Sequence, residues 1–156
     1  MKDIKTRAFA GAFIQWQDEV LLMKRSLNKT ITPGLWAGVG GHIEQSESDS
    51  PATACLREIT EETGILPIQI EQLDLRYFAL CKMDDAIDSI YYFIATLKEK
   101  PPLCETDEGE LYWVKIKDGI TLEMSPQMKA FYLNWINNLD DDNIYCFIDP
   151  DFKSLT

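Results

Sequence analysis

The chain has 156 residues, a length typical of one domain with its own hydrophobic core, so we expect a single domain over residues 1–156. Its 26 acidic and 15 basic residues give a net charge of −11. So negative a surface repels DNA, RNA and anionic membranes, which argues against a long nucleic acid or a membrane as a partner. A small polyanionic substrate remains compatible if a cation bridges the like charges.

The cysteines and the histidine argue against a zinc site. The four cysteines form no Cys-x-x-Cys pair, and His42 is the single histidine. No secretory leader is apparent, because the apolar run at residues 8–14 is short and suits a strand. No apolar run is long enough to span a membrane. We therefore expect a cytoplasmic protein whose thiols are reduced.

The first third of the chain is predicted to form three short apolar strands. They are expected at residues 7–15, 20–24 and 35–39. Residues 26–34 are mostly polar and end in Pro-Gly, which is typical of a loop. The third strand is expected to stop at Gly40-Gly41, and a second loop is expected over residues 42–50.

A helix with clear end signals follows. Ser50 is a suitable N-cap, and Pro51 occupies the first helical position, where its missing N–H is no loss. Gly64 is the expected C-terminal stop. The sequence therefore predicts a helix that begins at Pro51 and ends at Gly64.

The second half of the chain combines strands with one more helix. Strands are predicted at residues 68–82, 89–97, 110–116 and 144–148, with residues 83–88 as the turn between the first two. A helix is predicted from Ser125-Pro126 to about residue 138. Several strands interleaved with two helices indicate an α+β protein, with an α/β/α sandwich around a mixed central sheet.

The first helix carries an unusual group of acids. On a helical wheel, Glu58, Glu61 and Glu62 fall within an arc of about 100°. Like charges at these spacings repel one another, so the arrangement does not stabilise a helix by itself. Mg²⁺ prefers oxygen ligands, usually a few carboxylates together with phosphate oxygens of a substrate. A bound divalent cation would therefore explain why three acids share one face.

The residues around these acids support the same interpretation. A second side of the helix, suited to packing on the sheet, is formed by Ala52, Leu56, Ile59 and Thr63. Arg57 stands four residues before Glu61 and can hold a carboxylate through two parallel hydrogen bonds. Gly40-Gly41 allows a backbone carbonyl to approach a metal closely. The alternative is a solvated acidic helix face, which is the usual role of a charge run.

The spacing of these residues resembles the Nudix box, Gly-x5-Glu-x7-Arg-Glu-U-x-Glu-Glu-x-Gly-U, in which U is a bulky aliphatic residue. The matching positions are Gly41, Glu47, Arg57, Glu58, Ile59, Glu61, Glu62, Gly64 and Ile65. The box covers residues 41–65, and weaker likeness extends over residues 21–22, 34–36 and 110–113. The resemblance implies an α/β/α sandwich that hydrolyses nucleoside diphosphates linked to another group.

The loop before the helix departs from this pattern. Nine residues, and not seven, separate Glu47 from Arg57. This indicates a two-residue insertion before Pro51, and Asp49 occupies the unshifted spacing. Ser46 stands where many members of the family have glycine. The sequence thus leaves open whether Glu47 or Asp49 fills the position of the box glutamate.

By resemblance, the helix acids hold Mg²⁺, with Mn²⁺ as an alternative ion. Glu61 and Glu62 would be the main side-chain ligands. Glu58 would be a further ligand or the general base that deprotonates the attacking water. Arg57 would orient the carboxylates, and a carbonyl of Gly40 or Gly41 would complete the metal shell.

Other candidates lie outside the helix. Members of the family often add a distant acid from a later loop, and here Glu108 and Glu110 are the candidates, with Glu110 taken as the ligand. Lys24 and Arg25 could meet substrate phosphates, as could Glu47 through the loop that bears it. For the acids and the two basic residues alike, a solvated strand end is the alternative interpretation.

The substrate is approached by elimination, since the family's ADP-ribose, NADH and coenzyme A signatures are not found. A (deoxy)nucleoside triphosphate is therefore expected, above all an oxidised purine nucleotide such as 8-oxo-dGTP, with a nucleoside monophosphate and pyrophosphate as products. The alternatives are another nucleoside diphosphate derivative, an RNA 5′ end, or a module that senses a nucleotide without cleaving it. The sequence also leaves a homodimer open.

Overall fold

A mixed sheet of eight strands forms the centre of the molecule in the computed structural model, which describes residues 3–30 and 32–149. The strands are β1 (Lys5–Trp16), β2 (Glu19–Arg25), β3 (Trp36–Ala37), β4 (Val39–His42), β5 (Ile70–Lys82), β6 (Ala86–Leu97), β7 (Gly109–Lys115) and β8 (Tyr145–Ile148). Their order is β3-β2-β1-β6-β5-β8, and in addition β4 pairs with β1 and β7 pairs with β2. The β1–β6 and β5–β8 pairs are parallel and the others are antiparallel.

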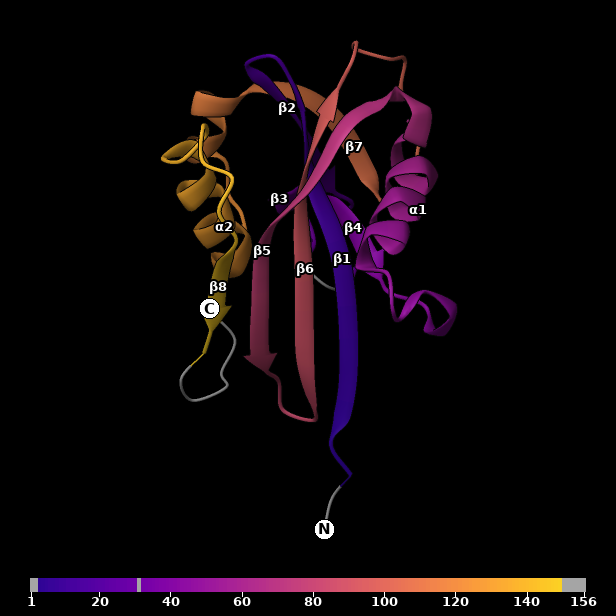
Figure 1. Cartoon of the computed structure of the whole chain (residues 1–156), viewed down its shortest axis with the longest axis vertical. Helices are drawn as coiled ribbons and strands as arrows, with labels where there is room; N and C mark the ends of the chain where they lie inside the picture. Colours follow the sequence, from indigo (N-terminus) through magenta and orange to yellow (C-terminus); the bar gives the residue numbers. More distant parts are fainter. Residues whose placement is uncertain (1–2, 31, 150–156) are drawn as a thin grey trace.

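The two helices, α1 (Pro51–Thr63) and α2 (Pro126–Ile136), lie on opposite sides of this sheet (Figure 1). Side-chain alternation along the strands explains why both faces are apolar. On β2, Leu21 and Met23 pack in the core beneath α1, whereas Val20 and Leu22 pack in the core beneath α2. The predicted α/β/α sandwich is confirmed.

Strand β1 changes its partner along its length. Residues 14–16 pair with β2, and residues 9–12 pair with β4. The predicted strand at residues 35–39 is therefore two strands, because the chain leaves β2 at Gly38 and crosses to β1. The expected stop at Gly40-Gly41 is also wrong, since β4 continues to His42. A Cβ on Gly40 would lie 2.6 Å from the carbonyl oxygen of Ala10, so this glycine permits close strand pairing.

The remaining elements lie close to their predicted positions. β6 begins three residues earlier than expected, at Ala86, which shortens the β5–β6 turn. The sequence did not predict the short 3-10 turns η1 (Gln45–Glu47), η2 (Pro67–Gln69) and η3 (Ile116–Thr121). Within the described part of the chain, no helix is long and apolar enough to cross a membrane.

Helix α1 has the predicted ends. The Ser50 hydroxyl accepts a hydrogen bond from the Thr53 N–H at 3.3 Å, and Gly64 ends the helix with φ +80°. The buried face consists of Ala54, Cys55, Ile59, Glu62 and Thr63. The expectation that Leu56 packs on the sheet is thus wrong. The sheet contacts a neighbouring stripe of α1, and Leu56 is half-buried on the outer side of the helix.

We predict that Gly64→Ala destabilises the protein by about 1–2 kcal/mol, because an alanine at φ +80° brings its Cβ too close to the following carbonyl. The added Cβ would also lie 3.2 Å from the Cβ of Cys104. Gly64→Asn is the matched control, since asparagine adopts the left-handed conformation more readily. Urea unfolding should show a smaller loss for Asn; an equal loss would mean that crowding by Cys104, and not the backbone, sets the cost.

Candidate functional site

Two of the three helix acids are held beneath strand β4. Glu62 is 8% exposed, and its Oε2 accepts a hydrogen bond from the Gly40 N–H at 3.2 Å. The Glu58 side chain is 13% exposed, and a Cβ on Gly41 would lie 2.5–2.8 Å from its carboxylate atoms. The two glycines therefore give the carboxylates room beside the strand, while the expected carbonyl contact with a metal stays a prediction.

Arg57 joins the acids of the loop and of the helix. Its Nε and Nη2 donate to the two carboxylate oxygens of Glu47 at 2.8 and 2.9 Å. Its Nη1 donates to Glu58 at 2.9 Å and to Glu61 at 3.1 Å, and Nη2 also reaches the carbonyl oxygen of His42 at 2.9 Å. This single guanidinium thus fixes α1 to the end of β4 and orients three carboxylates.

The two-residue insertion leaves this arrangement intact. The turn η1 brings Glu47 under Arg57, where Glu47 is 8% exposed, whereas Asp49 is exposed. Hydrogen bonds from Arg57 lower the pKa of Glu47, and the pair raises the pKa of Arg57. Glu47, and not Asp49, is therefore the acid that forms the two-pronged ion pair with Arg57.

Among the acids of α1, burial raises the pKa of Glu62 most. Burial, followed by the negative charge of Glu58, raises the pKa of Glu62 to about 8, although the Gly40 hydrogen bond opposes the shift. Burial also raises the pKa of Glu58 despite its contact with Arg57. Two adjacent carboxyl groups thus lack full compensation for their charge. Such a pair can be relieved by a proton or by a cation.

The oxygen donors of Glu58 and Glu62 suit a hard divalent cation such as Mg²⁺. Glu61 is 58% exposed and is turned toward Arg57, on the outer side of the pair. Among the described residues, no three His, Cys, Asp or Glu side chains are arranged so that they could hold a metal ion. The donor chemistry therefore fits the ion, which commonly binds one or two carboxylates and completes its shell with water and phosphate oxygens.

The structure places the two candidates for the distant acid differently. Strand β7 pairs with β2 so that Glu110 lies opposite Lys24, and both side chains face α2 because Val20 and Leu22 do. Glu110 therefore lies on the face of the sheet opposite the acids of α1, and its assignment as a metal ligand stays a prediction that this placement does not support. The charge of Glu108 raises the pKa of both Glu58 and Glu62, so Glu108 is the acid near the pair.

The same alternation separates the two basic candidates. Lys24 faces α2, while Arg25 faces α1 and lowers the pKa of Glu62. Both line a cleft of about 540 Å³ at the end of β2, together with Asp107 and Glu110. Lys29, which the sequence did not single out, binds Glu108 at 3.0 Å. Lys24 and Arg25 are consecutive residues of one strand, and side chains alternate between the two faces of a sheet. This alternation was the sequence signal that the two basic residues lie on different faces.

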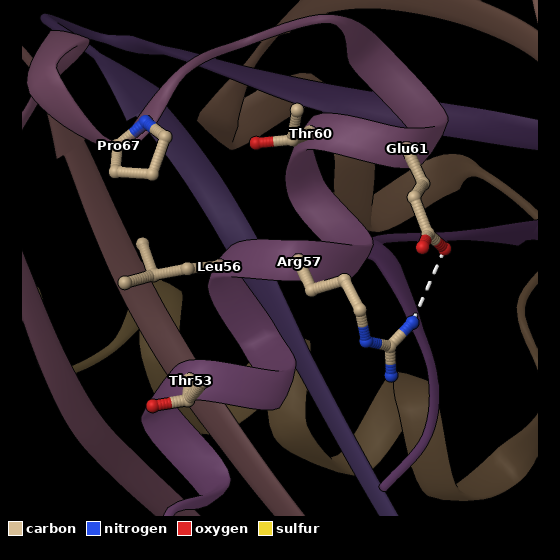
Figure 2. A pocket seen from close by; sticks show the side chains of 6 residues that line it. All are labelled: Thr53, Leu56, Arg57, Thr60, Glu61 and Pro67. Atoms are coloured by element: carbon tan, nitrogen blue, oxygen red, sulfur yellow. Dashed lines mark hydrogen bonds and ion pairs between the residues drawn. The ribbon is translucent and has the colours of Figure 1, made fainter. Parts of the chain in front are cut away.

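A second hollow, of about 420 Å³, lies on the outer side of α1. Figure 2 shows Thr53, Leu56 and Thr60 along one side of the helix, facing Pro67, while Arg57 and Glu61 point toward each other on the other side. This hollow is lined by the stripe of α1 that faces away from the sheet. It does not contain the buried pair of Glu58 and Glu62.

Comparisons with known proteins give one family. The family model described as NUDIX domain matches residues 5–136. The chain is 29% identical over 115 residues to the uncharacterized Nudix hydrolase YvcI of Bacillus subtilis (strain 168), covering 72% of this chain and 68% of that protein.

Solved structures show the same fold at low identity. A mutator MutT protein from Bacillus halodurans matches with a TM-score of 0.73 at 23% identity, and the match covers 96% of this chain and 95% of the MutT chain. An Ap4A hydrolase from C. elegans matches with a TM-score of 0.67 at 20% identity, over 86% of this chain and 98% of the hydrolase chain. The Nudix domain of Shewanella oneidensis NrtR, solved with ADP ribose, matches with a TM-score of 0.68 at 16% identity, over 89% of this chain and 90% of the NrtR chain.

We predict that Glu62→Gln stabilises the metal-free protein in a pH-dependent way. The pKa of Glu62 is raised from 4.5 to about 8 by folding, so the native state loses stability relative to the unfolded chain as pH rises through this window. The variant should match wild type near pH 4.5, gain several degrees in Tm by pH 8 and gain no more above it. Glu61→Gln, at a 58% exposed side chain, is the control. A constant Tm difference at every pH would contradict the prediction.

We also predict that Glu47→Ala lowers the Tm of the metal-free protein, whereas Asp49→Ala leaves it unchanged. Glu47 accepts two hydrogen bonds from Arg57 and is 8% exposed, while Asp49 is exposed. Removing Glu47 takes away the two hydrogen bonds that hold Arg57 to the loop, although Arg57 keeps its contacts with Glu58 and Glu61. Thermal unfolding followed by circular dichroism checks both variants, and equal effects would contradict the assignment of Glu47.

Proposed function

The chain belongs to the Nudix hydrolase family and is a pyrophosphohydrolase, and we propose that it acts with Mg²⁺ on a small nucleoside diphosphate derivative. The observation that carries the proposal is the pair of buried carboxyl groups, Glu58 and Glu62. Arg25, whose charge lowers the pKa of Glu62, also lines the cleft at the end of β2. The two carboxyl groups need a cation when both are ionised. A polyanionic substrate that enters a protein with a net charge of −11 needs a cation as well.

In this proposal the acids of α1 have two roles, metal binding and general-base catalysis. Glu61 and Glu62 would hold the cation together with a carbonyl oxygen of Gly40 or Gly41, and Glu58 would be a further ligand or the general base. When bound, Mg²⁺ neutralises phosphate oxygens and makes a coordinated water easier to deprotonate. Glu58 accepts the proton of the attacking water on a carboxylate oxygen, a contribution worth about 10²–10⁴-fold in general-base catalysis.

The residues around the acids position them. Arg57, fixed by Glu47, sets the orientation of Glu58 and of Glu61, so it acts through these carboxylates. We take Glu108 in place of Glu110 as the distant acid because its negative charge raises the pKa of both Glu58 and Glu62. Arg25 lies on the same face of the sheet and lines the cleft, which suits an interaction with substrate phosphates.

For the substrate we propose a (deoxy)nucleoside triphosphate, above all an oxidised purine nucleotide. Water would cleave one phosphoric anhydride bond and release a nucleoside monophosphate and pyrophosphate. The cleft of about 540 Å³ is in the size range of small-molecule sites. The MutT protein shares the fold of this chain, and the Ap4A hydrolase and the Nudix domain solved with ADP ribose are the reason to test other nucleoside diphosphate derivatives beside the triphosphates.

The experiment is a hydrolysis assay with Mg²⁺ over a substrate panel. The panel contains canonical dNTPs, 8-oxo-dGTP, ADP-ribose, NADH and dinucleoside polyphosphates, with the variant Glu61→Gln/Glu62→Gln beside wild type. We expect wild type alone to release monophosphate and pyrophosphate, and excess EDTA to abolish the release. Binding of a nucleotide without turnover of any compound would contradict hydrolysis and indicate a sensor.

We predict that Glu108→Gln reduces kcat/KM by at least about tenfold, whereas Glu110→Gln changes it less than about twofold. The reason is that Glu108 acts on the carboxylate pair and Glu110 lies on the opposite face of the sheet. Titration of activity with Mg²⁺ distinguishes lost metal affinity from lost substrate binding. The reverse order of the two variants would contradict the choice of acid.

A further inference from the structure

Lys24 lies between an acid and two aromatic rings at the end of β2. The strand register places Lys24 opposite Glu110 on β7 and opposite Trp36 on β3. Tyr112 stands two residues after Glu110, so both side chains are on the same face of the sheet. The Tyr112 ring also contacts the Trp36 ring, at 5.3 Å between centroids. Four side chains from three strands thus form one group on the α2 face of the sheet.

The carboxylate of Glu110 is held by Tyr112 and not by Lys24. The Tyr112 hydroxyl donates a hydrogen bond to Glu110 Oε2. In the part of the chain that the structure describes, the Lys24 ammonium forms no ion pair and no hydrogen bond. Opposite charges at facing positions of an antiparallel pair ordinarily attract each other. The bond from Tyr112 therefore takes the place of the ion pair that the register would allow between Lys24 and Glu110.

The ammonium of Lys24 is exposed and lines the cleft at the end of β2. Lysine binds phosphate groups as a point charge, so a free ammonium here suits a phosphorylated substrate. An ion pair with Glu110 would cancel this charge and turn the ammonium toward β7. Because the acids Asp107 and Glu110 line the same cleft, its attraction for a polyanion depends on which cations they neutralise.

We propose that Tyr112 is a positioning residue that holds Glu110 through its hydroxyl and so keeps the Lys24 ammonium free to bind a phosphate group of the substrate. Tyr112 acts through Glu110 and Lys24 and does not itself touch the substrate. The Trp36 ring supports the Tyr112 ring from the neighbouring strand. The proposal rests on the proposed function in taking this cleft as the place where the substrate phosphates bind.

The first test measures how fast Lys24 reacts with trace acetic anhydride in the metal-free protein, by mass spectrometry. Tyr112→Phe keeps the ring and releases Glu110, so we expect Lys24 to react about threefold more slowly, because a paired ammonium is deprotonated less readily. Tyr112→Phe/Glu110→Gln should restore the rate of wild type. Tyr145→Phe is the matched control, since the Tyr145 hydroxyl also donates to an acid, Asp141, at the opposite edge of the sheet.

The second test is the equilibrium binding of inorganic pyrophosphate in the presence of Mg²⁺. Tyr112→Phe should weaken binding by about threefold, and the double variant should bind like wild type. A tyrosine that only packs against Trp36 would give no rescue by Glu110→Gln. Equal acetylation of Lys24 in all variants would overturn the proposal. If the acetylation rates change as expected but wild type does not bind pyrophosphate, the phosphate-binding role of Lys24 and the proposed function are contradicted, and the control of Lys24 by Tyr112 stands.

Discussion

The burial of two adjacent carboxyl groups between α1 and β4 is the constraint around which this protein is built. Glu58 and Glu62 repel each other, and burial disfavours the charge of both. Stability alone does not select such a pair. Each feature around it offsets a part of the cost: Gly40 donates its N–H, Gly41 leaves space, and Arg57 brings positive charge to Glu58. The charge that remains uncompensated is relieved by a proton on Glu62 in the metal-free protein and, under the proposed function, by a divalent cation.

Arg57 connects this pair to the fold. Its guanidinium binds Glu47 with two hydrogen bonds and reaches the carbonyl of His42 at the end of β4. The loop, the strand and the helix are therefore held by one side chain, although two residues have been added between Glu47 and the helix. The insertion is accommodated where the chain is exposed, at residues 48–49.

The sequence predicted those features that depend on local periodicity. Helix α1 follows from a fixed rotation per residue, which also places Glu58 and Glu62 on one side, and the caps at Ser50 and Gly64 mark its ends. The choice between Glu108 and Glu110 depends on which face of the sheet α1 covers, so it required the pairing of β7 with β2. The crossing at Gly38 and the ring contact of Trp36 with Tyr112 also depend on contacts between distant strands. No short sequence pattern indicates such contacts.

The most direct measurement is the number of protons released when Mg²⁺ binds, obtained by calorimetry in buffers of different ionisation enthalpy. The pKa of Glu62 is raised to about 8 by burial and by Glu58, so most molecules carry this proton at pH 7 and must lose it to a cation. The account predicts release of nearly one proton per bound Mg²⁺ at pH 7 and almost none at pH 9.5. Binding without proton release at pH 7, or no binding at either pH, would contradict the role of the buried pair.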